Sequence, residues 1–83
     1  MFATLFVLLE IAGIAKMGAS IGAGLAVVGA GIGVGITGGH AMDAMARQPE
    51  MVGTLRSNMI LAAALVEGVA FFALVLCFLA MFA

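Results

Sequence analysis

Two long apolar stretches dominate this sequence and limit the folds that are open to it. The first runs from about Met17 to Gly39 and the second from Met59 to Ala83, with Glu67 as the only charged residue of the second. A helix needs about 20 predominantly apolar residues to cross the ~30 Å hydrocarbon core of a bilayer. Each stretch is long enough for one crossing, so we expect an all-α membrane protein with two transmembrane helices.

The composition leaves no material for a soluble domain beside these helices. Of the 83 residues, 66% are hydrophobic and 8% are charged, too few polar residues to cover a water-soluble fold. The net charge of -1 argues against nucleic acid as a partner, because that partner calls for clustered Lys and Arg. We therefore predict one hairpin over residues 1–83, with helices at about 3–46 and 50–83 and a loop at about 47–49.

The first 16 residues follow no pattern that assigns them a role. Residues 2–9 are apolar like the core of a signal peptide, but no basic leader precedes them and Glu10 follows directly. The first helix therefore has two possible starts, near residue 3 or near Met17. Cys77 lies deep in the second apolar stretch, cannot form an intrachain disulfide, and is read as a small hydrophobic residue.

Glycine is the unusual feature of the first stretch. Residues two apart in a helix lie on nearly opposite faces, so the alternating glycines divide between two sides. The first side holds Gly22, Gly29 and Gly33, and the second holds Gly24, Gly31, Gly35 and Gly38. Small residues let membrane helices approach closely. Two small-residue sides suit a helix with a like neighbour on each side, as in a closed ring. Tight packing inside a monomeric bundle is the alternative.

The connection between the stretches carries most of the remaining charge. Pro49 suits the first turn of the second helix, where its missing N–H is no loss, and Glu50 lies at the positive end of that helix. Arg47 and Arg56 flank the turn, so the positive-inside rule predicts a cytoplasmic loop. Lys16 near the other boundary opposes this assignment weakly.

Glu67 is the residue whose position in the membrane carries the largest free-energy cost. It lies 17 residues beyond Glu50, about 26 Å along a helix, and so deep in the hydrocarbon. A charged side chain there costs about 2.5–3.5 kcal/mol or more. Because desolvation disfavours the charged form, we expect Glu67 to be protonated in lipid and charged only where water or a cation reaches it. This behaviour suits a proton carrier; a structural carboxyl bonded between helices is the alternative.

Other polar residues give weaker indications. His40 could titrate, but its place near the loop favours a solvated surface histidine. No nucleophile, base or metal cluster accompanies Glu67, so we predict neither an enzyme nor a metal or cofactor site. A structural or pore-forming, holin-like oligomeric hairpin would explain the glycines and the hydrophobicity. It gives no reason for one membrane-buried carboxyl.

Three features in order resemble one family. The glycine series, the Arg47-Gln48-Pro49 loop, and Glu67 twenty residues after the loop arginine are similar to the c subunit of F-type ATP synthases, over about residues 18–83. Proteolipids of vacuolar-type ATPases share the carboxylate chemistry, but those chains are commonly longer, with duplicated hairpins. The resemblance implies a c-ring with the glycine-rich helices inside and Glu67 as the ion-binding carboxylate on the outer helices.

The resemblance also implies partners and a membrane. Glu67 would exchange its proton at two half-channels of the neighbouring a subunit, and the ring would carry it through lipid as it rotates. The loop residues Arg47, Gln48 and Pro49 would face the central stalk, gamma and epsilon, at the catalytic head. We expect the membrane to be the plasma membrane of a bacterium, with an organelle membrane as the alternative.

The residues that the family places near its carboxylate indicate the coupling ion. Sodium needs several oxygen ligands, and sodium rings of this family supply them from side chains at positions occupied here by Val34, Gly68 and Phe72. Those oxygens are missing. A proton needs only the carboxyl and one acceptor, such as the backbone carbonyl of Leu65 or a water. We therefore expect protons; Thr37, one turn from Val34, leaves sodium as the alternative.

Overall fold

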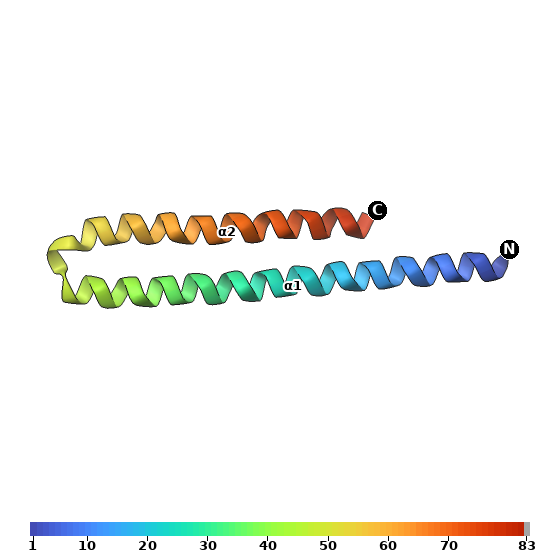
Figure 1. Ribbon diagram of the computed structural model, residues 1–83, viewed down its shortest axis with the longest axis horizontal. Helices are drawn as coiled ribbons and strands as arrows, with labels where there is room; N and C mark the ends of the chain where they lie inside the picture. Colours follow the sequence, from blue (N-terminus) through green and yellow to red (C-terminus); the bar gives the residue numbers. More distant parts are fainter. Residues whose placement is uncertain (83) are drawn as a thin grey trace.

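The computed structural model describes residues 1–82 as a hairpin of two antiparallel helices (Figure 1). Helix α1 runs over Phe2–Arg47, the 3-10 turn η1 over Pro49–Met51, and helix α2 over Val52–Phe82. Ala83, the last residue of the second predicted helix, lies outside the described residues. The expected all-α hairpin with two helices long enough to cross a membrane is confirmed. Of the two possible starts of the first helix, the structure has the earlier one.

The turn is set by the residue that precedes the proline. Ring atoms of proline disfavour helical geometry in the residue before it, and Gln48 has φ -131 and ψ 71. The Gln48 N–H still donates to the Ala44 carbonyl at 2.9 Å, and the Arg47 Nε donates to the Asp43 carbonyl at 3.4 Å. The first bond satisfies a carbonyl that the helix end would leave free, and the second adds a side-chain donor to the last turn. Pro49 then begins η1, where an N–H is not needed.

Small residues form most of the seam between the two helices. Ala19, 8% exposed, is the only buried side chain among residues 1–82. Along α1 the half-buried positions are mainly Gly and Ala, at Gly22, Ala23, Ala26, Ala30, Gly33, Val34, Thr37, Gly38, Ala41, Ala44 and Met45. In α2 they are Val52, Leu55, Met59, Ala62, Ala63, Val66, Ala70, Ala73, Leu74 and Cys77. Because lipid gives helices no hydrophobic reason to associate, this close backbone approach is what favours their packing.

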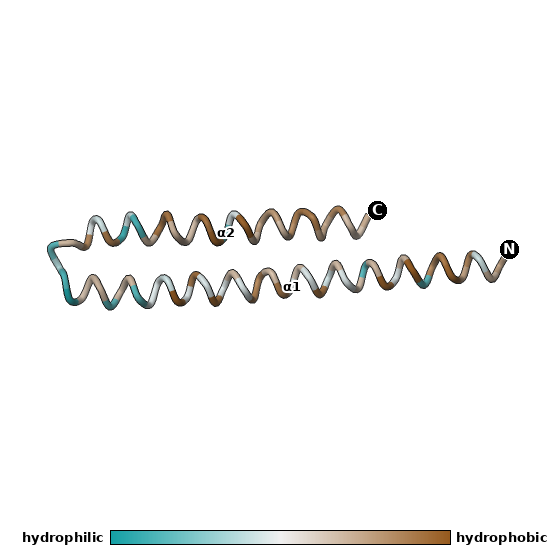
Figure 2. The backbone as a smooth tube through the Cα atoms, viewed as in Figure 1, coloured by the Kyte–Doolittle hydropathy of each residue, from teal (hydrophilic) through white to brown (hydrophobic). Residues whose placement is uncertain are grey.

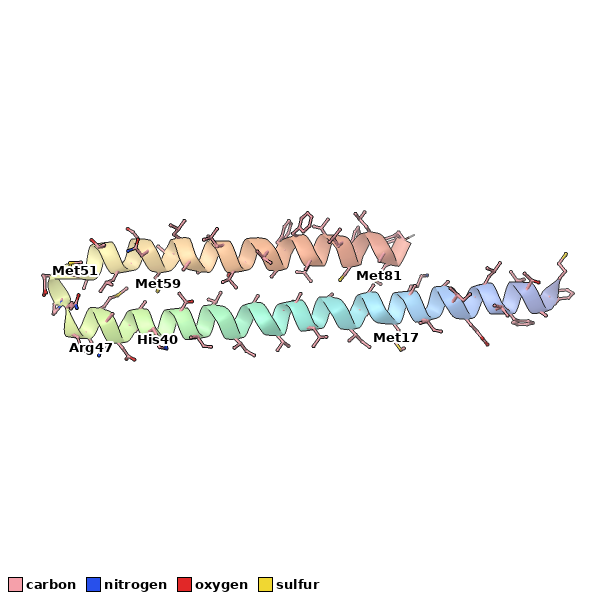
Figure 3. The ribbon with its side chains drawn as sticks, in the orientation of Figure 1. Met17, His40, Arg47, Met51, Met59 and Met81 are labelled. Carbon is pink, nitrogen blue, oxygen red and sulfur yellow. The ribbon has the colours of Figure 1, made fainter. Side chains whose placement is uncertain are left out.

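Two close approaches fix the register of the hairpin. A Cβ at Gly22 would lie 3.3 Å from the Cys77 Sγ, and a Cβ at Gly33 would lie 3.3 Å from the Val66 Cγ1. The two pairs share one antiparallel alignment. In the same register, Figure 3 shows Met59 level with His40, and Met81 level with Met17.

α1 continues well beyond the paired part of the hairpin. Its 46 residues correspond to about 69 Å at about 1.5 Å per residue, and the longest extent of the molecule is 72 Å. The register of Gly22 with Cys77 and of Gly33 with Val66 places Phe82, the last described residue of α2, level with Met17. Residues 2–16 therefore project past the end of α2 (Figure 1). We call residues 2–16 the overhang.

The surface has the character of a membrane protein. Large apolar side chains are exposed along both helices, including Leu61 at 61%, Val69 at 75% and Phe72 at 65%. Figure 2 shows hydrophilic residues gathered at the end that holds the turn, with mostly apolar residues along the rest of the hairpin. Exposed apolar surface of this extent is unfavourable in water and favourable in lipid.

Candidate ion-binding site

Glu67 lies at the middle of α2. Fifteen residues separate it from Val52, the first residue of the helix, and fifteen from Phe82, the last described one. At about 1.5 Å per residue it is about 22 Å from either end. Arg56 and Glu67 are the only two residues of α2 with charged side chains, and Arg56 is close to the turn. The carboxyl is therefore isolated in the apolar part of the hairpin.

A shallow groove of about 390 Å³ between the two helices holds Glu67. The side chains that share the groove with it are all apolar or absent. They belong to Val27, Ala30, Gly31, Val34, Ala70, Phe71 and Leu74. Glu67 is exposed at the groove surface, and it takes part in neither of the side-chain hydrogen bonds found within residues 1–82. The Glu67 groove thus offers one carboxyl and no second side-chain oxygen.

A second groove, of about 530 Å³, lies on the other side of the same seam. Ala30 and Ala70 line both grooves and therefore form the ridge between them. The remaining lining of this opposite groove comes from Ala26, Gly29, Leu65, Val66, Val69 and Ala73. Every lining residue here is apolar. The hairpin therefore has one side with a carboxyl and one side without.

The residues expected to support Glu67 do not all gather around it in one hairpin. Val34 lines the Glu67 groove. Leu65 lines the opposite groove, because residues two apart on a helix, such as Leu65 and Glu67, lie on nearly opposite faces. Gly68 and Phe72 are exposed and are not among the residues that line the Glu67 groove. Within a single chain, the structure brings together Val34 and Glu67 only.

The glycines separate into two kinds by what a side chain would meet. Gly22 and Gly33 face α2, where an added Cβ would touch Cys77 or Val66. For the other five glycines expected to pack between copies, an added Cβ would meet nothing within 4 Å; these are Gly24, Gly29, Gly31, Gly35 and Gly38. Close packing inside the hairpin accounts for Gly22 and Gly33, whereas within residues 1–82 no atom lies within 4 Å of a side chain added at the other five.

The loop residues form a separate polar region. Arg47, Gln48 and Pro49 are exposed at the turn, and His40 is exposed two turns earlier on α1. Glu67 lies 18 residues beyond Pro49, about 27 Å away along the helix. Neither His40 nor the loop therefore shares the environment of Glu67. Over residues 1–82, no group of three His, Cys, Asp or Glu side chains is placed to hold a metal ion.

Sequence reasoning missed several residues of the Glu67 groove. Ala70, Phe71 and Leu74 follow Glu67 at three, four and seven residues, the spacing of one helix face, so the helical period could have found them. Val27 carries no such signal, because its place beside Glu67 depends on the register between α1 and α2.

The part of this chain that matches known proteins includes the residues that line both grooves. The family model that describes the c subunit of ATP synthase matches residues 17–80. The ATP synthase c subunit of Bacteroides thetaiotaomicron is 63% identical over 70 residues, covering 84% of this chain and 82% of that protein. Its counterpart from Bacteroides fragilis is 61% identical over 82 residues, covering 94% of this chain and 96% of that protein. The counterpart from Thermotoga petrophila is 48% identical over 71 residues, covering 81% of this chain and 84% of that protein.

The two kinds of match differ at the overhang. The family model begins at Met17, the residue that is level with the described end of α2. The alignment with the Bacteroides fragilis protein leaves out only 6% of this chain and therefore takes in most of residues 2–16. The overhang lies outside the general family pattern but has a counterpart in at least one similar protein.

Proposed function

This chain belongs to the family of ATP synthase c subunits, and we propose that it is the proton-carrying part of the membrane rotor, with Glu67 as the proton carrier. The observation that carries the proposal is the placement of Glu67. It is a single carboxyl midway along α2, in a groove whose other side chains are all apolar. Such a group is stable in lipid only when it is neutral.

The chemistry of Glu67 follows from its alternating surroundings. While lipid faces the groove, the carboxyl keeps its proton, because no cation or dipole compensates a charge there. Where water or a positive charge from a neighbouring protein meets the groove, the carboxylate form becomes favourable and the proton leaves. Movement of the hairpin between these two surroundings carries one proton for each passage of Glu67. The chain itself binds and releases the proton and catalyses no covalent reaction.

The two unlike grooves support a ring of copies. A contact that joins two different sides is head-to-tail, and repeating it closes a ring when the rotation permits. We propose that the Glu67 groove of one copy faces the opposite groove of the next, with the exposed Glu67 carboxyl at the outer edge of this contact, where lipid or another protein reaches it. Leu65 of one copy then lies beside Glu67 of its neighbour, so this residue would meet the carboxyl between chains. The open glycines, such as Gly31 and Gly29 on the two sides, allow the α1 helices to approach closely.

The lining of the groove favours protons over sodium ions. Sodium is a hard cation that binds through several oxygen ligands, as the alkaline-earth ions do. The Glu67 groove supplies side-chain oxygens from Glu67 alone. Thr37 is half-buried in the seam and is not among the residues lining the groove. A proton needs no further ligand than the carboxyl itself.

The remaining partners and the orientation complete the proposal. The exposed turn of Arg47, Gln48 and Pro49 contacts the central stalk, gamma and epsilon, on the cytoplasmic side, as the flanking arginines favour. The a subunit supplies the aqueous access and a positive charge to Glu67. The membrane is the plasma membrane of a bacterium, and lipid covers the outward face of α2.

Carbodiimide labelling of the purified oligomer, mapped by mass spectrometry with and without sodium, tests the site. Carbodiimides react with protonated carboxyls in apolar surroundings, so we expect modification at Glu67 and at none of Glu10, Asp43 and Glu50. Those three carboxyls are the internal controls. Sodium should not slow the reaction.

Two results would overturn parts of this proposal separately. Protection of Glu67 by sodium would make sodium the transported ion. An unlabelled Glu67, under conditions in which the same reagent modifies a protonated carboxyl of a control protein, would remove Glu67 as the carrier and favour a structural hairpin.

A further inference from the structure

Phe71 is the residue of α2 that lines the Glu67 groove farthest from the seam. Ala70 marks the seam, because it lines both grooves. At about 100° per residue, Glu67 lies about 60° from Ala70 around the helix and Phe71 about 100°, in the same direction. Leu74, the other large lining residue of α2, lies only about 40° from Ala70. Phe71 therefore stands at the outer edge of the groove, between Glu67 and the surroundings of the hairpin.

Helical geometry directs the Phe71 side chain toward the turn that holds Glu67. The Cα–Cβ bonds of a helix tilt toward its N-terminus, and aromatic side chains adopt rotamers that continue in that direction. Phe71 follows Glu67 by four residues, the spacing at which two side chains lie on one face, one above the other. The ring of Phe71 therefore extends over the turn of Glu67.

No other position that flanks Glu67 on this face of α2 holds a large side chain. The flanking positions are three and four residues before and after it, and they hold Ala63, Ala64, Ala70 and Phe71. Toward the loop the carboxyl is thus bordered by methyl groups only, and toward the other end of α2 by one aromatic ring. Phe71 is the side chain of this helix that is large enough to shield the carboxyl.

Phe71 is held loosely in the hairpin. Its side chain is 67% exposed, and Glu67 beside it is exposed as well. Two staggered χ1 positions are open to an aromatic side chain in a helix, and an exposed side chain moves between rotamers in ps–ns without any change of the backbone. The ring can therefore occupy or leave the outer edge of the groove as its surroundings change.

A carboxyl at the outer edge of a contact keeps its proton in lipid only while water stays away from it, because dry surroundings favour the neutral form. A charged group inside a bilayer draws water defects toward itself, and an apolar side chain fixed beside the carboxyl opposes this. We propose that Phe71 is a movable cover of the proton site. Its ring closes the outer edge of the groove in lipid and turns aside where water or a polar protein surface meets Glu67. The cover rests on the proposed function and adds a residue that was not among those expected to support Glu67.

No second titratable group shares the surroundings of Glu67. The other residues that line its groove, and all those that line the opposite groove, have no ionisable side chain. On α2 the nearest ionisable side chains are Cys77, ten residues later in the seam, and Arg56, eleven residues earlier, each about 15 Å or more along the helix. On α1, Lys16 and His40 lie beyond the part that lines the groove. The pH response of Glu67 is therefore governed by how much water reaches it.

The pH dependence of carbodiimide labelling in the full-length oligomer tests the cover. Phe71→Ala removes the ring, so water should stabilise the charged carboxylate, and the pH at which labelling of Glu67 is half-maximal should fall by about one unit. Phe71→Leu restores a large apolar side chain and should keep the original midpoint. Both substitutions are at an exposed position, and native mass reports whether the ring has formed.

Phe78→Ala is the matched control. Phe78 follows Glu67 by eleven residues and is 61% exposed, much like Phe71. Eleven residues are about three turns, so Phe78 lies on the same side of α2 but too far along it to cover the carboxyl. Its removal should leave the midpoint unchanged. If Phe71→Ala rings do not assemble, Phe71→Val serves in their place and should lower the midpoint by a smaller amount.

The outcomes separate the cover from the proposed function. A lower midpoint for Phe71→Ala alone supports the cover. An unchanged midpoint in Phe71→Ala rings of normal mass overturns the cover and leaves Glu67 as the carrier. An equal fall for Phe78→Ala or for Phe71→Leu overturns the local role of the ring. A Glu67 that is unlabelled at every pH in the unsubstituted oligomer, while the reagent modifies a protonated carboxyl of a control protein, overturns the proposed function and the cover with it.

Discussion

The two parts of α1 form the same secondary structure from very different side chains. Between Met17 and Arg47 the helix is lined with Gly and Ala and packs against α2. The overhang contains mainly apolar residues such as Leu, Ile and Phe, and no helix within residues 1–82 lies beside it. Both parts are helical because backbone groups in lipid must bond internally. Helix formation is thus insensitive to the glycine content here, while the distance to a neighbour depends on it.

The two parts of the hairpin also hold unlike carboxyls. Glu67 lies in the paired region, in an apolar groove between the helices. Glu10 lies in the overhang, nine residues or two and a half turns before the buried Ala19, and so on the face of α1 turned away from α2. The carboxyl of Glu67 therefore lies on the side of the hairpin that holds the Glu67 groove, whereas the carboxyl of Glu10 lies on neither groove side. In the proposed ring, Glu67 lies at the contact between neighbouring copies and Glu10 does not.

The largest expected effect is a difference in proton transport between substitutions at Glu67 and at Glu10. Glu67→Gln should reduce proton transport by the reconstituted complex to background, because the amide cannot bind and release a proton. Glu10→Gln, the control, should keep transport within about twofold of the original rate, as most exposed substitutions do. ATP-driven acidification of vesicles measures both. Transport that survives Glu67→Gln, with ring mass unchanged, would contradict the assigned role.

A smaller effect distinguishes the glycine region from the overhang on one lateral side. Gly31→Leu should prevent a ring of normal size, since a bulky side chain would separate adjacent α1 helices. Gly13→Leu lies on the same side five turns earlier and should leave the ring size unchanged, because larger residues already set the spacing there. Native mass spectrometry gives the number of copies. An unaltered ring in both variants would refute the packing argument.

The smallest expected effect lies within the paired region. An added Cβ at Gly33 would be 3.3 Å from the Val66 Cγ1, whereas one at Gly39 would meet nothing within 4 Å. Gly33→Ala should leave the hairpin less stable than Gly39→Ala by about 1 kcal/mol or more, because overpacking opposes the helix propensity that both variants gain. Gly39→Ala should stabilise it by up to about 1 kcal/mol through helix propensity.

Thermal unfolding in detergent, followed by circular dichroism, checks this difference. Val66→Ala introduced beside Gly33→Ala should restore stability, because it removes the methyl groups that the new side chain meets. Failure of that restoration, or equal shifts for Gly33→Ala and Gly39→Ala, would show that the close approach does not limit the seam.

Local chemistry was enough to predict the two helices, the turn at Pro49 and the isolated position of Glu67 in the apolar part of the hairpin. The length of each apolar stretch gave the helices, and the restriction that proline places on Gln48 gave the turn. The cost of a carboxyl in lipid singled out Glu67. Periodicity also indicated two small-residue sides of α1, though it could not tell which glycines serve the hairpin itself.

The alignment of the two helices could not be read from either stretch and came from their packing. The register placed Val27 beside Glu67 and Leu65 on the opposite side of the seam, and it assigned Gly22 and Gly33 to contacts with α2. It also left residues 2–16 projecting beyond the pair. Periodicity fixes the face of one helix on which a residue lies, but the level and side of its neighbours depend on how far the second helix has slid and rotated. Contacts across the seam make that choice.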